Sequence, residues 1–165
     1  GKEYALRAVT LAPNEAEAHL SVAISLAKMT SLFDKKGQME ASKEIKAELD
    51  KVIALDPSKD LAWHLMGCWN QKLANVGLVK RTLARVFYGK VPDATNEEAV
   101  KCFQEAIKLN PDRLIHHIEL GRTYAQMGEI EDAKKCLKKG LAMPITGKDD
   151  PDAKVRGRET LNSLQ

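Results

Sequence analysis

The chain has 165 residues, of which 26 are Lys or Arg and 23 are Asp or Glu; its formal net charge is +3, and 44% of its residues are hydrophobic. This length is enough to bury roughly 70% of the unfolded surface without a disulfide or a metal, and this balance of apolar and charged residues excludes a disordered polyelectrolyte and a membrane-embedded protein. No apolar run reaches the roughly 18 residues of a spanning helix, and three cysteines without a Cys-x-x-Cys pair favour a reducing compartment.

Four segments share one pattern, an amphipathic helix that ends just before a proline. The prolines are Pro13, Pro57, Pro111 and Pro144. Because proline disfavours helical geometry in the residue before it, each of them marks the end of a helix. Residues 1–13 therefore read as the second helix of an incomplete repeat.

The segments between these prolines match a known helix-turn-helix repeat of about 34 residues. In the last unit, Gly121 and Tyr124 fall in the first helix, and Ala133 and Leu137 fall in the second. Small residues at Gly121 and Ala133 are expected where the two helix backbones approach each other. The chain thus resembles a tetratricopeptide array, and we predict an all-α fold of antiparallel helix hairpins in a right-handed superhelix.

The distances between the prolines reveal two insertions. Pro13 and Pro57 are 44 residues apart, and Pro57 and Pro111 are 54 apart, against a repeat of about 34. The larger insertion predicts an extra helix from Leu78 to Tyr88, followed by a capping box at Thr95 to Glu98 that restarts the second helix. The expected units are repeats at 16–57, with about 10 inserted residues, at 60–111, with about 20, and at 114–147, then a capping helix at 152–165.

The first helices of such an array line its concave face, and the side chains expected there are more apolar than polar. The predicted groove residues are Leu20, Ile24, Leu61, His64, Leu65, Cys68, Ile115, Ile118 and Arg122. An apolar trough of this kind fits a partner helix or an acyl chain. Alternatively, the inserted helix folds into the trough through residues such as Leu83 and Phe87, which would make the trough part of the core.

All of the excess positive charge lies in and before the larger insertion. Residues 61–92 hold five basic and no acidic side chains. Lys80, Arg81 and Arg85 fall on one side of the predicted helix and form a basic face. This face would attract an acidic protein surface or an anionic membrane surface, although a solvated face without a partner explains such a charge run equally well.

Nothing in the sequence indicates catalysis or a bound cofactor. Motifs for a nucleophilic serine, a phosphate loop or a zinc-binding helix are lacking. His116 and His117 have no partners at the spacing of metal ligands, and Cys68, Cys102 and Cys136 are expected to be small buried residues. Without alternating basic and aromatic residues, nucleic acid is not an expected partner. The sequence therefore predicts no enzyme, no cofactor and no metal site.

The region around the larger insertion is more specific than a generic repeat. Its distinctive stretches are Trp63-His64-Leu65-Met66-Gly67-Cys68-Trp69, Lys80-Arg81-Thr82-Leu83-Ala84, Phe87-Tyr88-Gly89 and, further on, Met143-Pro144-Ile145-Thr146. These stretches resemble the regulator of microtubule dynamics family, although Cys68 stands where that family usually has arginine. The resemblance implies association with microtubules or spindle poles and, as in a member at the mitochondrial surface, phospholipid binding and transfer at organelle contacts.

Two functional hypotheses follow. The first is a non-catalytic interaction domain that binds a protein partner or microtubules. The second is a phospholipid carrier whose apolar groove holds acyl chains at membrane contacts. In both, the resemblance implies a cytoplasmic protein, on microtubules or at the surface of mitochondria or the endoplasmic reticulum.

Overall fold

The computed structural model describes residues 2–76 and 93–164, and over these residues every regular element is helical. The predicted all-α fold is therefore confirmed, while the predicted helix from Leu78 to Tyr88 lies outside the described residues. The elements are α1 (Lys2–Leu11), α2 (Ala16–Met29), the short 3-10 helix η1 (Thr30–Leu32), α3 (Lys35–Leu55), α4 (Asp60–Ala74), α6 (Asn96–Leu109), α7 (Leu114–Met127), α8 (Ile130–Ala142) and α9 (Asp150–Ser163).

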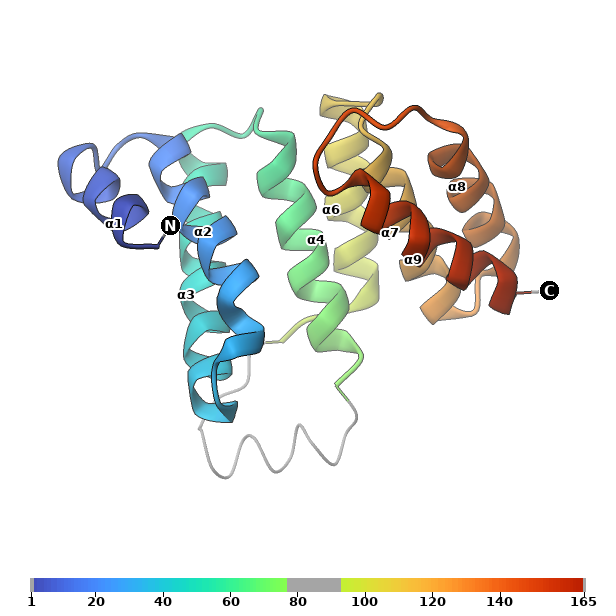
Figure 1. Ribbon diagram of the computed structural model, residues 1–165, viewed down its shortest axis with the longest axis horizontal. Helices are drawn as coiled ribbons and strands as arrows, with labels where there is room; N and C mark the ends of the chain where they lie inside the picture. Colours follow the sequence, from blue (N-terminus) through green and yellow to red (C-terminus); the bar gives the residue numbers. More distant parts are fainter. Residues whose placement is uncertain (1, 77–92, 165) are drawn as a thin grey trace.

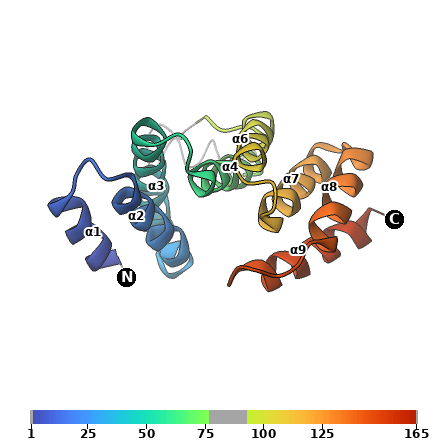
Figure 2. The same ribbon diagram turned by 90° about the horizontal axis from the view of Figure 1, so that it is seen from above.

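Three antiparallel hairpins, α2/α3, α4/α6 and α7/α8, stand side by side along the molecule (Figure 1). Helix α1 packs against α2 at one end, and α9 packs across α7 and α8 at the other. Seen from above, α2, α4 and α9 lie on one side of the row, and α3 and α6 lie on the other (Figure 2). In none of the described helices is there a stretch that is long and apolar enough to cross a membrane.

Glycine lets the two helices of a hairpin approach closely at the predicted position. A Cβ atom on Gly121 would lie 2.7 Å from Leu137 Cγ and 3.0 Å from the Ala133 carbonyl oxygen. On Gly67, it would lie 2.7 Å from the Phe103 ring. The close approach predicted at Gly121 and Ala133 is confirmed, and Gly67 plays the same part between α4 and α6.

The helix ends follow local capping chemistry. The Thr95 hydroxyl accepts a hydrogen bond from the Glu98 amide at 3.1 Å, as predicted for the start of α6. The Glu98 carboxylate instead accepts from Lys101 Nζ at 2.6 Å, so only the threonine half of the capping box is confirmed. Gly128 caps the C-terminus of α7 with a positive φ of 80°, a conformation that glycine adopts without strain.

A ring nitrogen at the same place in three first helices binds the proline that precedes the helix. Each proline carbonyl accepts a hydrogen bond from the ring six residues later, at 2.8 Å in every case. The pairs are Pro13 with His19 Nε2, Pro57 with Trp63 Nε1, and Pro111 with His117 Nε2. This repeated bond ties the turn between consecutive hairpins to the following helix.

Candidate functional site

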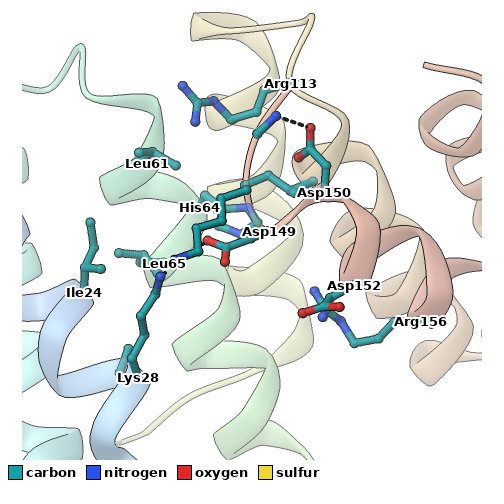
Figure 3. A pocket seen from close by; sticks show the side chains of 14 residues that line it. Ile24, Lys28, Leu61, His64, Leu65, Arg113, Asp149, Asp150, Asp152 and Arg156 are labelled. Carbon is teal, nitrogen blue, oxygen red and sulfur yellow. Dashed lines mark hydrogen bonds and ion pairs between the residues drawn. The ribbon is translucent and has the colours of Figure 1, made fainter. Parts of the chain in front are cut away.

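The inner face of the array contains a cavity of about 350 Å³ that helices α2, α4, α7 and α9 enclose together. We call it the inner groove (Figure 3). Its lining residues are Ile24, Ala27, Lys28, Leu61, His64, Leu65, Arg113, Ile115, Gly147, Lys148, Asp149, Asp150, Asp152 and Arg156. Four elements from three hairpins and the last helix therefore converge on one site.

The floor of the inner groove is apolar and its rim is charged. Ile24, Leu61, Leu65 and Ile115 are half-buried and supply the floor from α2, α4 and α7. The rim carries four cations and three carboxylates, namely Lys28, Arg113, Lys148 and Arg156 with Asp149, Asp150 and Asp152. With both signs present in similar number, the rim suits a ligand that carries both charges at least as well as a simple anion.

Several rim charges are already engaged. Lys28 Nζ lies 3.7 Å from Asp149 Oδ2, so an exposed ion pair bridges the mouth of the groove from α2 to the start of α9. The Asp150 carboxylate accepts hydrogen bonds from the amides of Thr146 and Gly147. Over residues 2–76 and 93–164, Lys148 and Asp152 have no ion pair, and these two charges remain available to a ligand.

Below the rim, the carboxylate of Glu119 in α7 is almost completely buried, with 4% of its side chain exposed. It accepts a hydrogen bond from Arg122 Nη1 at 2.6 Å and two from Arg156, at 3.0 Å to Nη2 and 3.2 Å to Nε. Two arginines are thus held by one buried carboxylate. Arg122, which the sequence placed in the groove, points to Glu119 and does not line the cavity.

Beside the floor runs a chain of polar side chains that joins two repeats. His116 Nε2 lies 2.9 Å from Asp60 Oδ2, and His116 Nδ1 lies 3.0 Å from His64 Nδ1. His64 Nε2 in turn lies 3.6 Å from Cys68 Sγ. His116 is fully buried and His64 is 8% exposed. At the Asp60 end of this row of side chains, Arg113 Nε lies 2.8 Å from Asp60 Oδ2.

Burial sets the protonation of these groups. Burial, together with the neighbouring His116 and Arg113, holds the pKa of His64 well below its ordinary value. Burial also lowers the pKa of His116, although the Asp60 carboxylate opposes it. Burial raises the pKa of the Cys68 thiol to about 12. Since the attacking form of cysteine is the thiolate, burial of Cys68 disfavours attack by its sulfur.

A second cavity of about 360 Å³ lies between α2, α3 and α4, and we call it the Trp69 cavity. It is mainly apolar, and its lining residues are Ala27, Thr30, Gln38, Ser42, Ile45, Leu65, Cys68, Trp69, Lys72, Leu73 and Val76. Ala27 and Leu65 also line the inner groove, so the two cavities adjoin. Trp69 Nε1 donates to the carbonyl and hydroxyl oxygens of Ser42, both at 3.0 Å.

The structure brings together part of the predicted groove. Ile24, Leu61, His64, Leu65 and Ile115 line the inner groove, and Cys68 lines the Trp69 cavity. Leu20 and Ile118 are 3% and 0% exposed and pack within the core. The predicted basic face of Lys80, Arg81 and Arg85 lies outside the described residues.

Sequence reasoning missed the partners of the two central histidines. His64 and His116 are 52 residues apart, and only the packing of α4 against α7 makes them neighbours. The bonds between rings and prolines, in contrast, have a sequence signal, because His19, Trp63 and His117 each follow a proline by six residues. In the described part of the chain, no three His, Cys, Asp or Glu side chains are placed to hold a metal ion.

The fold and the inner groove define a helical-repeat protein of the tetratricopeptide type. Among solved structures, "Crystal structure of MamA" matches with a TM-score of 0.60 and 15% identity, covering 97% of this chain and 82% of that one. A second MamA structure matches with a TM-score of 0.57, again at 15% identity, covering 97% of this chain and 73% of that one. At this identity the likeness concerns the fold alone.

The family can be named from the sequence match. The model of the family described as "Regulator of microtubule dynamics protein 1-3" matches residues 1–165, and the chain belongs to that family. Regulator of microtubule dynamics protein 2 of Rattus norvegicus is 25% identical over 166 residues, which cover all of this chain and 40% of the relative. Protein 1 of Caenorhabditis elegans is 27% identical over 150 residues, covering 91% of this chain and 66% of the relative.

Regulator of microtubule dynamics protein 1 of Rattus norvegicus is 28% identical over 163 residues, which cover 98% of this chain and 53% of the relative. The chain thus spans between about two fifths and two thirds of the length of these three relatives. These relatives are named as regulators of microtubule dynamics.

Proposed function

We propose that this chain is a non-catalytic interaction domain whose inner groove binds an amphipathic segment of a protein partner at the microtubule. The observation that carries the proposal is the groove itself, where an apolar floor built by three helices lies under a rim of both charges. An amphipathic helix docks by inserting its apolar face and placing its flanking charges at the rim.

Individual side chains favour such a ligand. Leu61, Leu65 and Ile115 offer apolar contact without being part of the closed core, since each is only half-buried. Lys148 and Asp152, which have no ion pair among the described residues, can match opposite charges on the partner. Charges at such a rim act mainly on specificity and on the rate of association.

Family membership supplies the proposed location. The relatives are named for microtubule dynamics, and the sequence from 61 to 92 holds five basic side chains and no acidic one. Lys80, Arg81 and Arg85 would add electrostatic attraction to the acidic microtubule surface. Because such attraction acts through solvent, binding should weaken as ionic strength rises.

Co-sedimentation with microtubules assembled in a cell extract, which retain their associated proteins, tests both parts. The groove variant carries Leu61→Glu and Ile115→Glu, the basic variant carries Lys80→Glu, Arg81→Glu and Arg85→Glu, and the control carries Leu55→Glu, an exposed leucine outside the groove. We expect the groove and basic variants to lose binding at least tenfold while the control binds normally. Normal binding by the groove variant would reject a role for the groove at the microtubule.

One observation favours a second candidate, a phospholipid carrier. The inner groove, with four cations at its rim, adjoins the mainly apolar Trp69 cavity through Ala27 and Leu65. A headgroup at the rim with acyl chains reaching toward Trp69 would use both cavities. Native mass spectrometry of the purified chain tests this candidate. An adherent mass of several hundred daltons that disappears in an Ala27→Trp variant supports the carrier, and a bare polypeptide counts against it.

A further inference from the structure

Two imidazole rings from different repeats meet in the contact between α4 and α7 under the inner groove, where Gln71 Nε2 also donates to Thr123 Oγ1 at 2.9 Å. His64 and His116 meet nitrogen to nitrogen, with 3.0 Å between their Nδ1 atoms and 5.0 Å between ring centroids. His64 lines the groove, while the α4 and α7 residues Leu61, Leu65 and Ile115 form most of its floor. Any change in this contact therefore alters the shape of the groove.

The direction of each hydrogen bond follows from the groups at the two ends of this row of side chains, Asp60 and Cys68. An ionised Asp60 carboxylate only accepts, so His116 carries its proton on Nε2 and donates to Asp60. The bare Nδ1 of neutral His116 then accepts from Nδ1–H of His64. The remaining nitrogen of His64, Nε2, is the acceptor for the Cys68 thiol. In this state every donor faces an acceptor.

Added protons change this arrangement in two steps. The first proton can be accommodated, because an imidazolium on His116 donates to Asp60 and to His64 once the protons of His64 and Cys68 reverse their direction. A second proton makes both Nδ1 atoms donors, and two N–H groups then face each other at 3.0 Å. Two like charges at this distance in a buried site repel strongly, so the second proton destabilises the contact between α4 and α7 at the two rings.

The surrounding charges limit this behaviour. Asp60 and Cys68 face the pair from α4, Arg113, His117 and Glu119 lie around it at the start of α7 and within α7, and Arg156 reaches it from α9. Helix α6 presents the Phe103 ring, whose centroid lies 5.5 Å from that of His64. The carboxylates of Asp60 and Glu119 attract a proton, whereas Arg113 and Arg156 repel it.

We propose that the His64–His116 pair is an acid-sensitive latch that holds α4 against α7 and, when doubly protonated, opens the floor of the inner groove. Burial lowers the pKa of both rings, in agreement with a latch that is closed at neutral pH. The latch would regulate the inner groove, so its consequence for partner binding rests on the proposed function. The acid-induced opening itself does not depend on that function.

Hydrogen exchange of the chain without any ligand tests the latch. Exchange is compared between pH 7.5 and 5, after correction for the intrinsic pH dependence, in α4 and α7 and, as a reference, in α2 and α3. We expect α4 and α7 of the wild type to lose protection about tenfold more than the reference helices on acidification. Uniform loss in all four helices would overturn the proposal.

Two variants make the test specific to the ring pair. His64→Gln keeps a side chain that hydrogen-bonds His116 but whose amide can turn to offer either a donor or an acceptor, so no facing donors arise. This variant should keep α4 and α7 protected at pH 5. The matched control is His19→Gln, which replaces another buried histidine without a histidine partner. Because His19 lies in the reference helix α2, this variant is compared with the wild type in α4 and α7 alone, where it should open like the wild type. Equal acid opening in His64→Gln and the wild type would reject the latch.

A second measurement needs no variant. Nitrogen chemical shifts of the wild-type imidazoles at pH 7 report which ring atoms carry protons. The latch requires a protonated Nδ1 on His64 and a bare Nδ1 on His116, and the same state on both atoms would refute it. Because neither measurement involves a partner, failure of the latch leaves the microtubule co-sedimentation result unaffected, and the reverse also holds.

Discussion

Arg156 of α9 donates two hydrogen bonds to the buried carboxylate of Glu119 in α7, at 3.0 Å from Nη2 and 3.2 Å from Nε. This pair lies directly below the rim of the inner groove and attaches the last helix to the third hairpin. Since Asp152 and Arg156 themselves line the groove, the helix expected only to cap the array also forms one wall of the site.

Replacing Arg156 with Ala should destabilise the chain. The change removes two of the three arginine hydrogen bonds to Glu119 and leaves the buried carboxylate with Arg122 alone. We expect a loss of about 1–3 kcal/mol in the free energy of unfolding, measured by urea denaturation. The control is Arg158→Ala, an exposed arginine on the same helix, which should change stability by less than about 0.5 kcal/mol. Equal stability of the two variants would contradict this role for Arg156.

Gly67→Ala should force α4 and α6 apart. The new Cβ would lie 2.7 Å from the Phe103 ring, which is fully buried and has little room to move. Overpacking of this kind costs about 1–3 kcal/mol and exceeds the roughly 1 kcal/mol that alanine gains over glycine within a helix. The double variant Gly67→Ala with Phe103→Leu should recover part of the loss. A variant as stable as the wild type in thermal and urea unfolding would show that the contact is not tight.

Stability should fall in mild acid. Burial lowers the pKa of His64, His116 and His117 in the folded chain, whereas the unfolded chain titrates them near 6.5. The unfolded state therefore binds more protons below that pH, so stability is complete above about pH 6.5 and is lost as the pH falls towards the folded-state values. Urea unfolding between pH 7.5 and 5 measures this slope. His117→Gln should make the slope shallower, and a stability that stays constant down to pH 5 would contradict the assignment.

The Cys68 thiol should react slowly in the folded chain. With a pKa of about 12, its thiolate fraction at pH 8 is on the order of a thousandfold smaller than in the unfolded chain. Alkylation by iodoacetamide, followed for each cysteine by peptide mass spectrometry, should therefore label Cys68 slowly without urea and rapidly in urea. His64→Gln leaves the thiol buried and should keep it slow. Fast labelling of native Cys68 would instead indicate an activated thiol.

Much of the fold could be predicted because it depends on local chemistry. The prolines at 13, 57 and 111 end helices through their own backbone geometry, whatever packs around them. Similarly, the glycine in the first helix of a repeat contacts a bulky residue of the second helix. Each of these features involves residues of a single hairpin. The known length of the repeat is therefore enough to locate them in the sequence. The hydroxyl cap at Thr95 is equally local.

The candidate site could be predicted only in part. Ile24, Leu65 and Ile115 were expected on the inner face from their positions in the repeat, and they do line the groove. Ile118 occupies a similar position, but it is fully buried, because α9 brings Gly157 and Ala153 against the same cluster. The position of α9 over α7 depends on long-range pairs such as Glu119 with Arg156, which no periodicity predicts.

The amino-acid sequence by itself determined the family and the helical class, since those depend on residue identity at short spacing. Only the tertiary structure decided that His64 meets His116 and that the inner groove has a charged rim. The physical reason is that both features join side chains from separate hairpins, and their distances depend on how those hairpins pack against one another.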